Sequence, residues 1–167
     1  NGKSFAEPTN IHTLRKQLRN YYDSGQYFRE IAKVAQEADT YITNAAKENL
    51  KQTQPDKLAV VLDIDETSLS YYKNMAKRHF CYDAIAVRDE ILTTNAPAIE
   101  PVLNLYRNAI KNKISVFFVT ARRSYAHQAT MRNLKVAGFT QYTGLYTRPS
   151  TYKKGSIKAF KSETRAM

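Results

Sequence analysis

The sequence predicts an α/β protein built on a parallel sheet, and three observations support this fold class. Short apolar runs at 58–62, 114–119 and 145–147 are separated by segments whose apolar residues recur at helical spacing. The first run has no polar alternation, which is typical of a parallel strand covered on both faces. A chain of 167 residues with 43% hydrophobic residues can bury one ordinary core but is too short for two full domains.

The first third of the chain, residues 1–54, is predicted to be a helical extension that precedes the sheet. After an extended lead-in, apolar residues at 11, 14 and 18 indicate a short helix, which breaks at Asp23-Ser24-Gly25. A long amphipathic helix follows, with apolar residues spaced three and four apart at Tyr27, Ile31, Val34, Ala38, Tyr41 and Ala45.

The α/β core is predicted to cover residues 57–167. Its first strand is followed by an irregular, tyrosine-containing stretch at 66–96, which is too long for a simple loop. We therefore expect a helical, cap-like insertion over the strand ends. Three further helices are predicted. One opens at Asn95 and Pro97, and a second is capped by Ser124 and ends at Gly138. The third runs from Tyr152 to Ala166.

Repeated strand and helix units join in right-handed crossovers, which gives a Rossmann-like sheet with helices on both faces.

The net charge of the chain indicates which class of ligand it attracts. Lys and Arg total 26 against 15 Asp and Glu, a net charge of +11, which favours anionic partners. The basic residues are dispersed and no nucleic-acid-binding motif accompanies them, so nucleic acid is not the expected partner. No apolar run approaches the ~20 residues of a membrane span. The single cysteine, Cys81, excludes an intramolecular disulfide and is expected to be buried or half-buried.

Polar side chains follow the first two strands at the edge where parallel sheets bind ligands. Asp63 and Asp65 leave the first strand two residues apart, a spacing that projects both carboxylates to one side. One carboxylate could attack a substrate while the other moves a proton. After the second strand, Thr120, Arg122 and Arg123 offer a hydroxyl, helix-start amides and two guanidinium groups to an anion such as phosphate.

These motifs resemble the haloacid dehalogenase (HAD) superfamily, within it the branch of class B and class C acid phosphatases and plant vegetative storage proteins. The stretch Asp63-Ile64-Asp65-Glu66-Thr67-Ser68-Leu69-Ser70 resembles the first motif of that branch. The second and third motifs are matched by Val119-Thr120-Ala121-Arg122 and Phe160-Lys161-Ser162-Glu163-Thr164-Arg165. Flanking segments also agree, namely Glu7-Pro8, Tyr-Tyr-Asp-Ser-Gly at 21–25, and Asn95-Ala96-Pro97-Ala98-Ile99.

The resemblance implies a phosphatase that hydrolyses phosphate monoesters through an aspartyl-phosphate. Asp63 is then the nucleophile, and Asp65 protonates the leaving oxygen and later deprotonates water. Thr120 is expected to hydrogen-bond the transferring phosphoryl group, while Lys161 offsets negative charge. Lys153, Lys154 and Lys158 are nearby alternatives, and the Lys-Ser-x-x-Arg context favours Lys161. The expected cofactor is Mg²⁺, held by the Asp63 carboxylate, the Asp65 backbone carbonyl and a later acidic residue.

That later residue belongs to a fourth motif, Gly-Asp-x-x-Ser/Asn-Asp, which the sequence lacks before Met167. We therefore expect a truncated piece of a longer protein, with a naturally short gene as the alternative. The strand of the fourth motif normally flanks the first strand, so its loss is expected to expose a sheet edge through which the protein could self-associate. The resemblance also implies a secreted, periplasmic or cell-envelope location after removal of a signal sequence.

Several readings stay open at this stage. Arg122 is a candidate substrate contact or an ordinary surface charge, and Tyr71 either forms an aromatic wall against the leaving group or packs in the core. Glu66 is expected to be structural rather than a second base, and the three histidines are too scattered for a metal site. The expected substrates are small phosphate esters, including nucleoside monophosphates. The alternatives are a storage or binding protein with little or no turnover, and a phosphotransferase.

Overall fold

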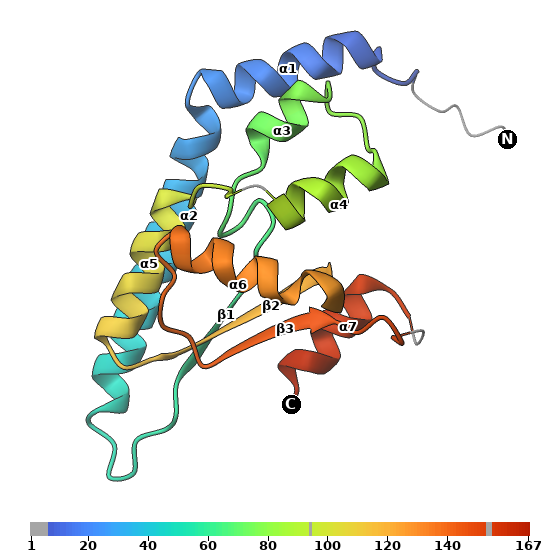
Figure 1. Cartoon of the computed structure of the whole chain (residues 1–167). Helices are drawn as coiled ribbons and strands as arrows, with labels where there is room; N and C mark the ends of the chain where they lie inside the picture. The colour runs from blue at the N-terminus through green and yellow to red at the C-terminus, as the bar shows by residue number, and fades with distance from the viewer. Residues whose placement is uncertain (1–6, 94, 153–154) are drawn as a thin grey trace, which may run out of the picture.

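The computed structural model describes residues 7–93, 95–152 and 155–167. Within these ranges three parallel strands form one sheet in the order β1-β2-β3, with helices on both faces, so the predicted α/β fold is confirmed (Figure 1). The elements in chain order are α1 (Ile11–Asp23), α2 (Gln26–Asn49), β1 (Ala59–Leu62), α3 (Tyr72–Lys77), α4 (Ala84–Thr93), α5 (Glu100–Lys111), β2 (Ser115–Arg123), the 3₁₀ turn η1 (Ser124–Ala126), α6 (His127–Val136), β3 (Gly144–Arg148) and α7 (Ile157–Arg165).

The N-terminal extension consists of two helices that meet at a sharp bend. The Asn10 side chain caps α1 by accepting hydrogen bonds from the amides of His12 and Thr13. Gly25 joins α1 to α2 with φ of 75°, a left-handed conformation that glycine adopts without a steric penalty. Helix α2 then packs along α5 (Figure 1), which confirms the predicted long amphipathic helix.

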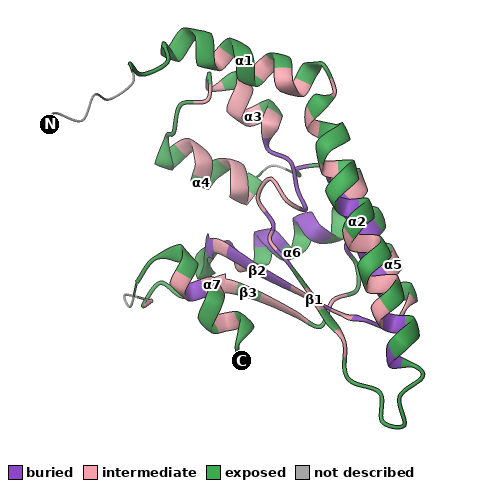
Figure 2. Cartoon of the chain, turned by 180° about the vertical axis from the view of Figure 1, so that it is seen from behind, coloured by how far each residue is buried: buried purple, intermediate pink, exposed green. Residues whose placement is uncertain are grey.

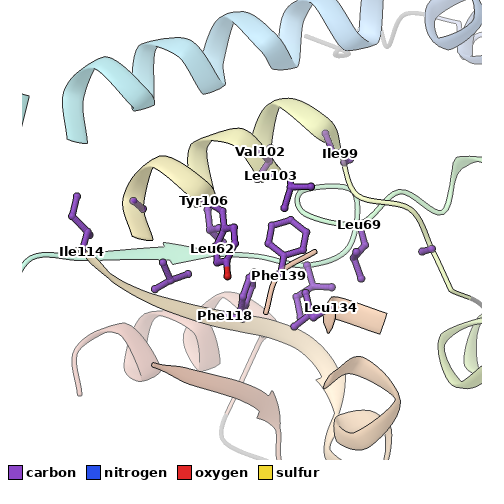
Figure 3. Close-up of a cluster of buried hydrophobic side chains, with 14 of the residues drawn as sticks. Leu62, Leu69, Ile99, Val102, Leu103, Tyr106, Ile114, Phe118, Leu134 and Phe139 are labelled. Atoms are coloured by element: carbon purple, nitrogen blue, oxygen red, sulfur yellow. The ribbon is translucent and has the colours of Figure 1, made fainter. Parts of the chain in front are cut away.

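The main core lies on the face of the sheet that is covered by α5 and α6 (Figure 3). Val116 and Phe118 of β2 point into it and are fully buried. Helix α6 ends where predicted: Gly138 has φ of 99°, and the amide of Phe139 donates to the Leu134 carbonyl at 2.9 Å. This termination turns the chain back and places the Phe139 ring beside Phe118 and Tyr106.

The opposite face of the sheet is less covered. Helix α7 packs on β2 and buries Phe160, but Val61 of β1 remains 39% exposed and Tyr146 of β3 41% exposed. The prediction that the first strand is covered on both faces is therefore wrong for this part of the chain. The side chains of Ala59 and Val61 are exposed on this open face, while Leu62 points into the core.

The described residues of the segment at 66–96 contain two helices, α3 and α4. The guanidinium of Arg78 pairs with the Glu90 carboxylate through Nε at 2.9 Å and Nη2 at 3.0 Å, which ties the end of α3 to α4. Helix α1 lies across α3, where Arg19 donates to the carbonyl of Ala76 at 2.7 Å (Figure 1). Helices α1, α3 and α4 contain no buried residue, so they form an open layer above the sheet (Figure 2). Cys81 in this layer is exposed, which corrects the expected buried thiol.

Three predicted helix starts differ from the structure. Helix α5 begins at Glu100 rather than at Asn95 or Pro97, because Ala98 forms a bridge with Leu69 and keeps the preceding residues extended. Ser124 does not cap α6; its Oγ lies 3.1 Å from Ser150 Oγ. The last helix begins at Ile157 and not at Tyr152, because the Ser156 side chain accepts the amide of Ala159 and so caps the helix there. Lys153 and Lys154, within the predicted helix, lie outside the described residues.

Candidate functional site

The loop after β1 is a tight turn that holds two carboxylates at the carboxyl end of the strand. The carbonyl of Ile64 accepts hydrogen bonds from the amides of Thr67, Ser68 and Leu69 at 3.3, 2.9 and 2.9 Å. Ser68 Oγ also donates to the carbonyl of Asp63 at 2.6 Å. The loop is thus fixed by its own backbone, and the sheet edge at which Asp63 emerges is the one where ligands bind in α/β proteins.

Asp63 lies on the α7 side of the sheet, where it forms an ion pair with Lys161. Lys161 Nζ is 2.6 Å from Asp63 Oδ2, and the two side chains are 22% and 34% exposed. Helix α7 therefore brings the lysine chosen from the sequence to the predicted nucleophile across almost 100 residues of chain (161 − 63). Both groups remain in contact with water, so an incoming anion can reach them.

Asp65 is held by Arg122 from β2, on the α6 side of the sheet, so the prediction that the Asp63 and Asp65 carboxylates project to one side is wrong. The guanidinium donates from Nε to both carboxylate oxygens at 3.1 and 3.2 Å and from Nη2 to Oδ1 at 2.8 Å. The Arg122 side chain is only 1% exposed, whereas that of Asp65 is 41% exposed. Burial alone lowers the pKa of Arg122, but the Asp65 carboxylate outweighs burial and raises the pKa above its usual value. Arg122 is therefore a buried cation, and its reading as an ordinary surface charge is wrong.

A buried hydrogen-bond network continues from Arg122 into the α6 side of the molecule. Arg122 donates through Nη1 to Thr130 Oγ1 at 3.0 Å and through Nη2 to the Tyr71 hydroxyl at 3.1 Å. The Tyr71 hydroxyl donates in turn to Asn133 Oδ1 at 3.2 Å, and burial raises the pKa of Tyr71. Asn133 also binds both the amide and the carbonyl of Ala96, at 3.1 and 2.8 Å. This network fixes the guanidinium that holds Asp65.

Sequence reasoning missed Asn133, although a signal was present. Thr130 and Asn133 stand three residues apart, next to Leu134, on the buried face of α6. Polar residues among apolar ones on a buried helix face require hydrogen-bond partners. Arg122 and Tyr71 remain predicted substrate contacts. In this structure the Arg122 guanidinium points to Asp65, and Tyr71 and Asp65 both line one cavity, which is described below.

Thr120 lies at the second junction and is completely buried. Its Oγ1 accepts the amide of Arg122 at 3.2 Å. β2 continues as a strand to Arg123, so the helix-start amides expected at this junction are absent from it. A register shift between Thr120 and Arg123 interrupts the ladder to β3. Arg122 follows the alternation of Val116, Phe118 and Thr120 and points inward to Asp65.

A cavity of about 300 Å³ opens between Asp65 and the helical insertion. Glu66 lines the same cavity and accepts hydrogen bonds from the Tyr27 hydroxyl at 3.2 Å and from the Tyr71 amide. Burial raises the pKa of Glu66. Its contacts match the structural role predicted for it. The remaining walls come from the insertion and are mostly apolar: Met75, Arg78, Phe80, Cys81, Tyr82, Val87, Glu90 and Ile91.

The oxygen donors at this edge suit Mg²⁺ chemically. Mg²⁺ is usually bound by one or two carboxylates together with waters and substrate phosphate, and Asp63 and Asp65 supply carboxylate and carbonyl oxygens here. Across residues 7–93, 95–152 and 155–167, no group of three or more His, Cys, Asp or Glu side chains could hold a metal. His127 forms a hydrogen bond instead, with its Nδ1 3.3 Å from Thr147 Oγ1.

A parallel α/β sheet with an Asp-x-Asp turn after its first strand, and a lysine that reaches the first aspartate from the helix after β3, defines a protein of the haloacid dehalogenase type. The sequence profile of the HAD superfamily, subfamily IIIB (acid phosphatase), matches residues 6–167, and the chain belongs to this family. The family predicted from the three motifs is thereby confirmed.

Individual relatives agree with this assignment. Acid phosphatase 1 of Solanum lycopersicum is 29% identical over 151 residues, which cover 89% of this chain and 57% of that protein. The class C acid phosphatase of Bacillus anthracis has a TM-score of 0.68 at 19% identity and covers 93% of this chain and 65% of its own. A second structure of that enzyme, with tungstate bound, gives 0.68 at 17% identity, covering 92% and 64%. The chain therefore spans less than two thirds of the length of these relatives, and the solved structures support the fold alone.

No described helix is both long enough and apolar enough to cross a membrane.

Proposed function

We propose that the protein hydrolyses small phosphate monoesters with Asp63 as the nucleophile. The observation that carries the proposal is the contact of 2.6 Å between Lys161 and Asp63 at the open carboxyl edge of the sheet. A cation at this position attracts the phosphate dianion and offsets the charge that gathers as a carboxylate attacks phosphorus. Thr120 is proposed to orient the phosphoryl group from β2.

The reaction has two steps. In the first, an Asp63 oxygen forms a bond to phosphorus, the bond from phosphorus to the leaving oxygen breaks, and Asp65 gives its proton to that oxygen. In the second, Asp65 takes a proton from water, the water oxygen attacks phosphorus, and inorganic phosphate leaves as the Asp63 carboxylate is restored. Because Asp65 must carry a proton in the first step, we expect an acidic pH optimum.

Arg122 and the cavity beside Asp65 support this division of roles. The hydrogen bonds from Arg122 to both oxygens fix the Asp65 carboxylate in one orientation, and a cavity opens beside Asp65. The mostly apolar walls suit the organic part of a small ester, including a nucleoside. Mg²⁺, when bound at Asp63 and the Asp65 carbonyl, would supply additional positive charge for the phosphoryl oxygens.

Hydrolysis of p-nitrophenyl phosphate by the purified protein, measured against pH with and without EDTA, tests this function. We expect an acidic optimum and loss of activity in EDTA. Lys161→Gln should reduce kcat/KM by on the order of 10²-fold or more, whereas Lys158→Gln, an exposed lysine on the same helix, should leave it unchanged. Equal effects of the two substitutions, or an alkaline optimum, would contradict the assignment.

The same assay separates the two alternative functions. Phosphate binding without turnover would indicate a storage or binding protein, and transfer of the phosphoryl group to an added alcohol in preference to water would indicate a phosphotransferase. We further propose a secreted, periplasmic or cell-envelope location, which fractionation of the source cells tests.

The exposed edge of β1 supports a proposal of self-association. Within the described residues β1 pairs only with β2, and its Val61 side chain is exposed. An unpaired strand edge can pair with a second copy of the chain. Light scattering should show dimers whose fraction falls in Val61→Lys, while Val136→Lys, an exposed valine on α6, serves as the control. A monomer at all concentrations would contradict this proposal.

A further inference from the structure

Two arginines occupy paired positions at the carboxyl ends of β2 and β3. Arg123 and Arg148 are register partners in the sheet, and partners on adjacent strands place their side chains on the same face. Thr147 contacts His127 of α6, so Arg148, the next residue, faces the opposite side, which α7 covers. The same alternation holds for Arg123, because Arg122 points to Thr130 on α6.

This arrangement is electrostatically unfavourable without a ligand. Like charges on neighbouring strands repel each other, and in the described part of the chain neither Arg123 nor Arg148 forms an ion pair. The residues outside the described ranges include no acidic side chain that could supply one. Arg148 Nε is also buried without a hydrogen-bond partner among the described residues. A buried donor of this kind is costly unless a ligand satisfies it.

Two hydroxyl groups border the arginine pair. Ser124 follows Arg123 and Ser150 lies two residues after Arg148; their Oγ atoms are 3.1 Å apart, and both residues are exposed. Arg123 is exposed as well, so an anion from solution can reach the pair. Two guanidinium groups with neighbouring hydroxyls form a donor set that matches the oxygens of a phosphate group.

We propose that Arg123 and Arg148 bind a second phosphate group of the substrate, so that the preferred substrate is a bisphosphate. This inference rests on the proposed function, which places the reacting phosphate at Asp63. Because β3 is two strand spacings from β1, the second phosphate would lie roughly 10 Å from the first. Asp63 contacts Lys161 of α7, so the reacting phosphate would lie on the same side of the sheet as the arginine pair. A small sugar bisphosphate spans this separation.

Calorimetric binding to the Asp63→Asn variant, which cannot form the aspartyl-phosphate, tests the proposal without turnover. The probes are fructose 6-phosphate, fructose 1,6-bisphosphate and inorganic phosphate, all at a fixed salt concentration of 0.15 M. We expect the bisphosphate to bind at least about tenfold more tightly than the monophosphate. Adding Arg148→Gln or Arg123→Gln should remove this gain. Arg132→Gln, an exposed arginine on α6, removes the same charge and should preserve the gain.

Each outcome decides between the two proposals. If the monophosphate binds and the wild-type protein hydrolyses it, but the bisphosphate gains nothing, the second site is overturned and the proposed function stands. Tighter bisphosphate binding that survives both Arg148→Gln and Arg123→Gln also overturns the site, as does an equal loss of affinity in Arg132→Gln.

If inorganic phosphate occupies a second site that only Arg148→Gln and Arg123→Gln remove, while the bisphosphate binds no more tightly than the monophosphate, the pair binds free phosphate and the substrate assignment is wrong. If no probe binds, both proposals fall. Arg123 is exposed, so its variant is expected to fold even if Arg148→Gln does not.

Discussion

Asp63 and Asp65 stand two residues apart in the sequence, yet they form ion pairs on opposite sides of the sheet. On the α7 side, Asp63 pairs with Lys161, and both side chains remain partly exposed. On the α6 side, Asp65 pairs with Arg122, a guanidinium that is almost completely buried and makes further hydrogen bonds to Thr130 and Tyr71. One carboxylate is accessible and the other is anchored. This difference suits the proposed roles, because a nucleophile must be reached by the substrate whereas a proton donor must be oriented.

The largest expected difference between the two aspartates is in turnover. Asp63→Asn should reduce phosphate release by on the order of 10⁴-fold or more, since an amide cannot form the aspartyl-phosphate. Asp65→Asn should still permit phosphorylation by esters with good leaving groups, which need less protonation. Trapping of labelled phosphoenzyme by acid quench measures the difference. Equal trapping in the two variants would remove Asp63 from the role of nucleophile.

The same two substitutions should have the reverse order of effects on stability. Asp65→Asn leaves the buried Arg122 without its counter-charge and should lower the free energy of unfolding by about 3 kcal/mol. Asp63→Asn leaves Lys161, which water can solvate, and should change the free energy of unfolding by less than about 0.5 kcal/mol. Urea unfolding of both variants at neutral pH is the measurement. Similar losses would show that the two ion pairs are equally anchored.

A third test examines the network behind Arg122. Asn133→Ala removes the partner of the Tyr71 hydroxyl and of both backbone groups of Ala96, and should cost about 2 kcal/mol. It should also lower kcat for alkyl phosphates more than for p-nitrophenyl phosphate, because poor leaving groups depend on a well-placed Asp65. Asn104→Ala, an exposed position on α5, is the control. A uniform fall for both substrates would indicate a purely structural role.

The smallest expected effect concerns the hydrogen bond from Tyr27 of α2 to Glu66, which joins the N-terminal helices to the loop after β1. Burial raises the pKa of Tyr27 above the ordinary value of 10.0, and the Glu66 carboxylate raises it further. The unfolded chain therefore ionises first as the pH rises above 10, and the folded state loses stability by up to about 1.4 kcal/mol per pH unit from this group. Tyr27→Phe should make the fall between pH 10 and 11 shallower, as measured by urea midpoints. Tyr41→Phe, at an exposed position on α2, should leave the slope unchanged.

Much of the site could be predicted from local patterns. An apolar run that ends at Asp63 places a carboxylate at the binding edge of a parallel sheet whatever the rest of the chain does. The Lys-Ser-x-x-Arg context favoured Lys161 among the nearby lysines, and the structure places its Nζ 2.6 Å from Asp63. The helix starts at Ser124 and Tyr152 were predicted wrongly, because side chains distant in sequence and local caps compete for the same backbone groups.

Short-range periodicity and motif spacing were enough to predict the order of the strands and helices and the family. Which cation each carboxylate meets depends instead on tertiary packing. Arg122 and Arg123 are adjacent and chemically identical, yet the alternation of the strand sends one into the buried network of α6 and the other to Arg148 on the α7 side. The direction of each depends on the register between β2 and β3 and on which helix covers each face, and both are set by packing between segments far apart in the chain.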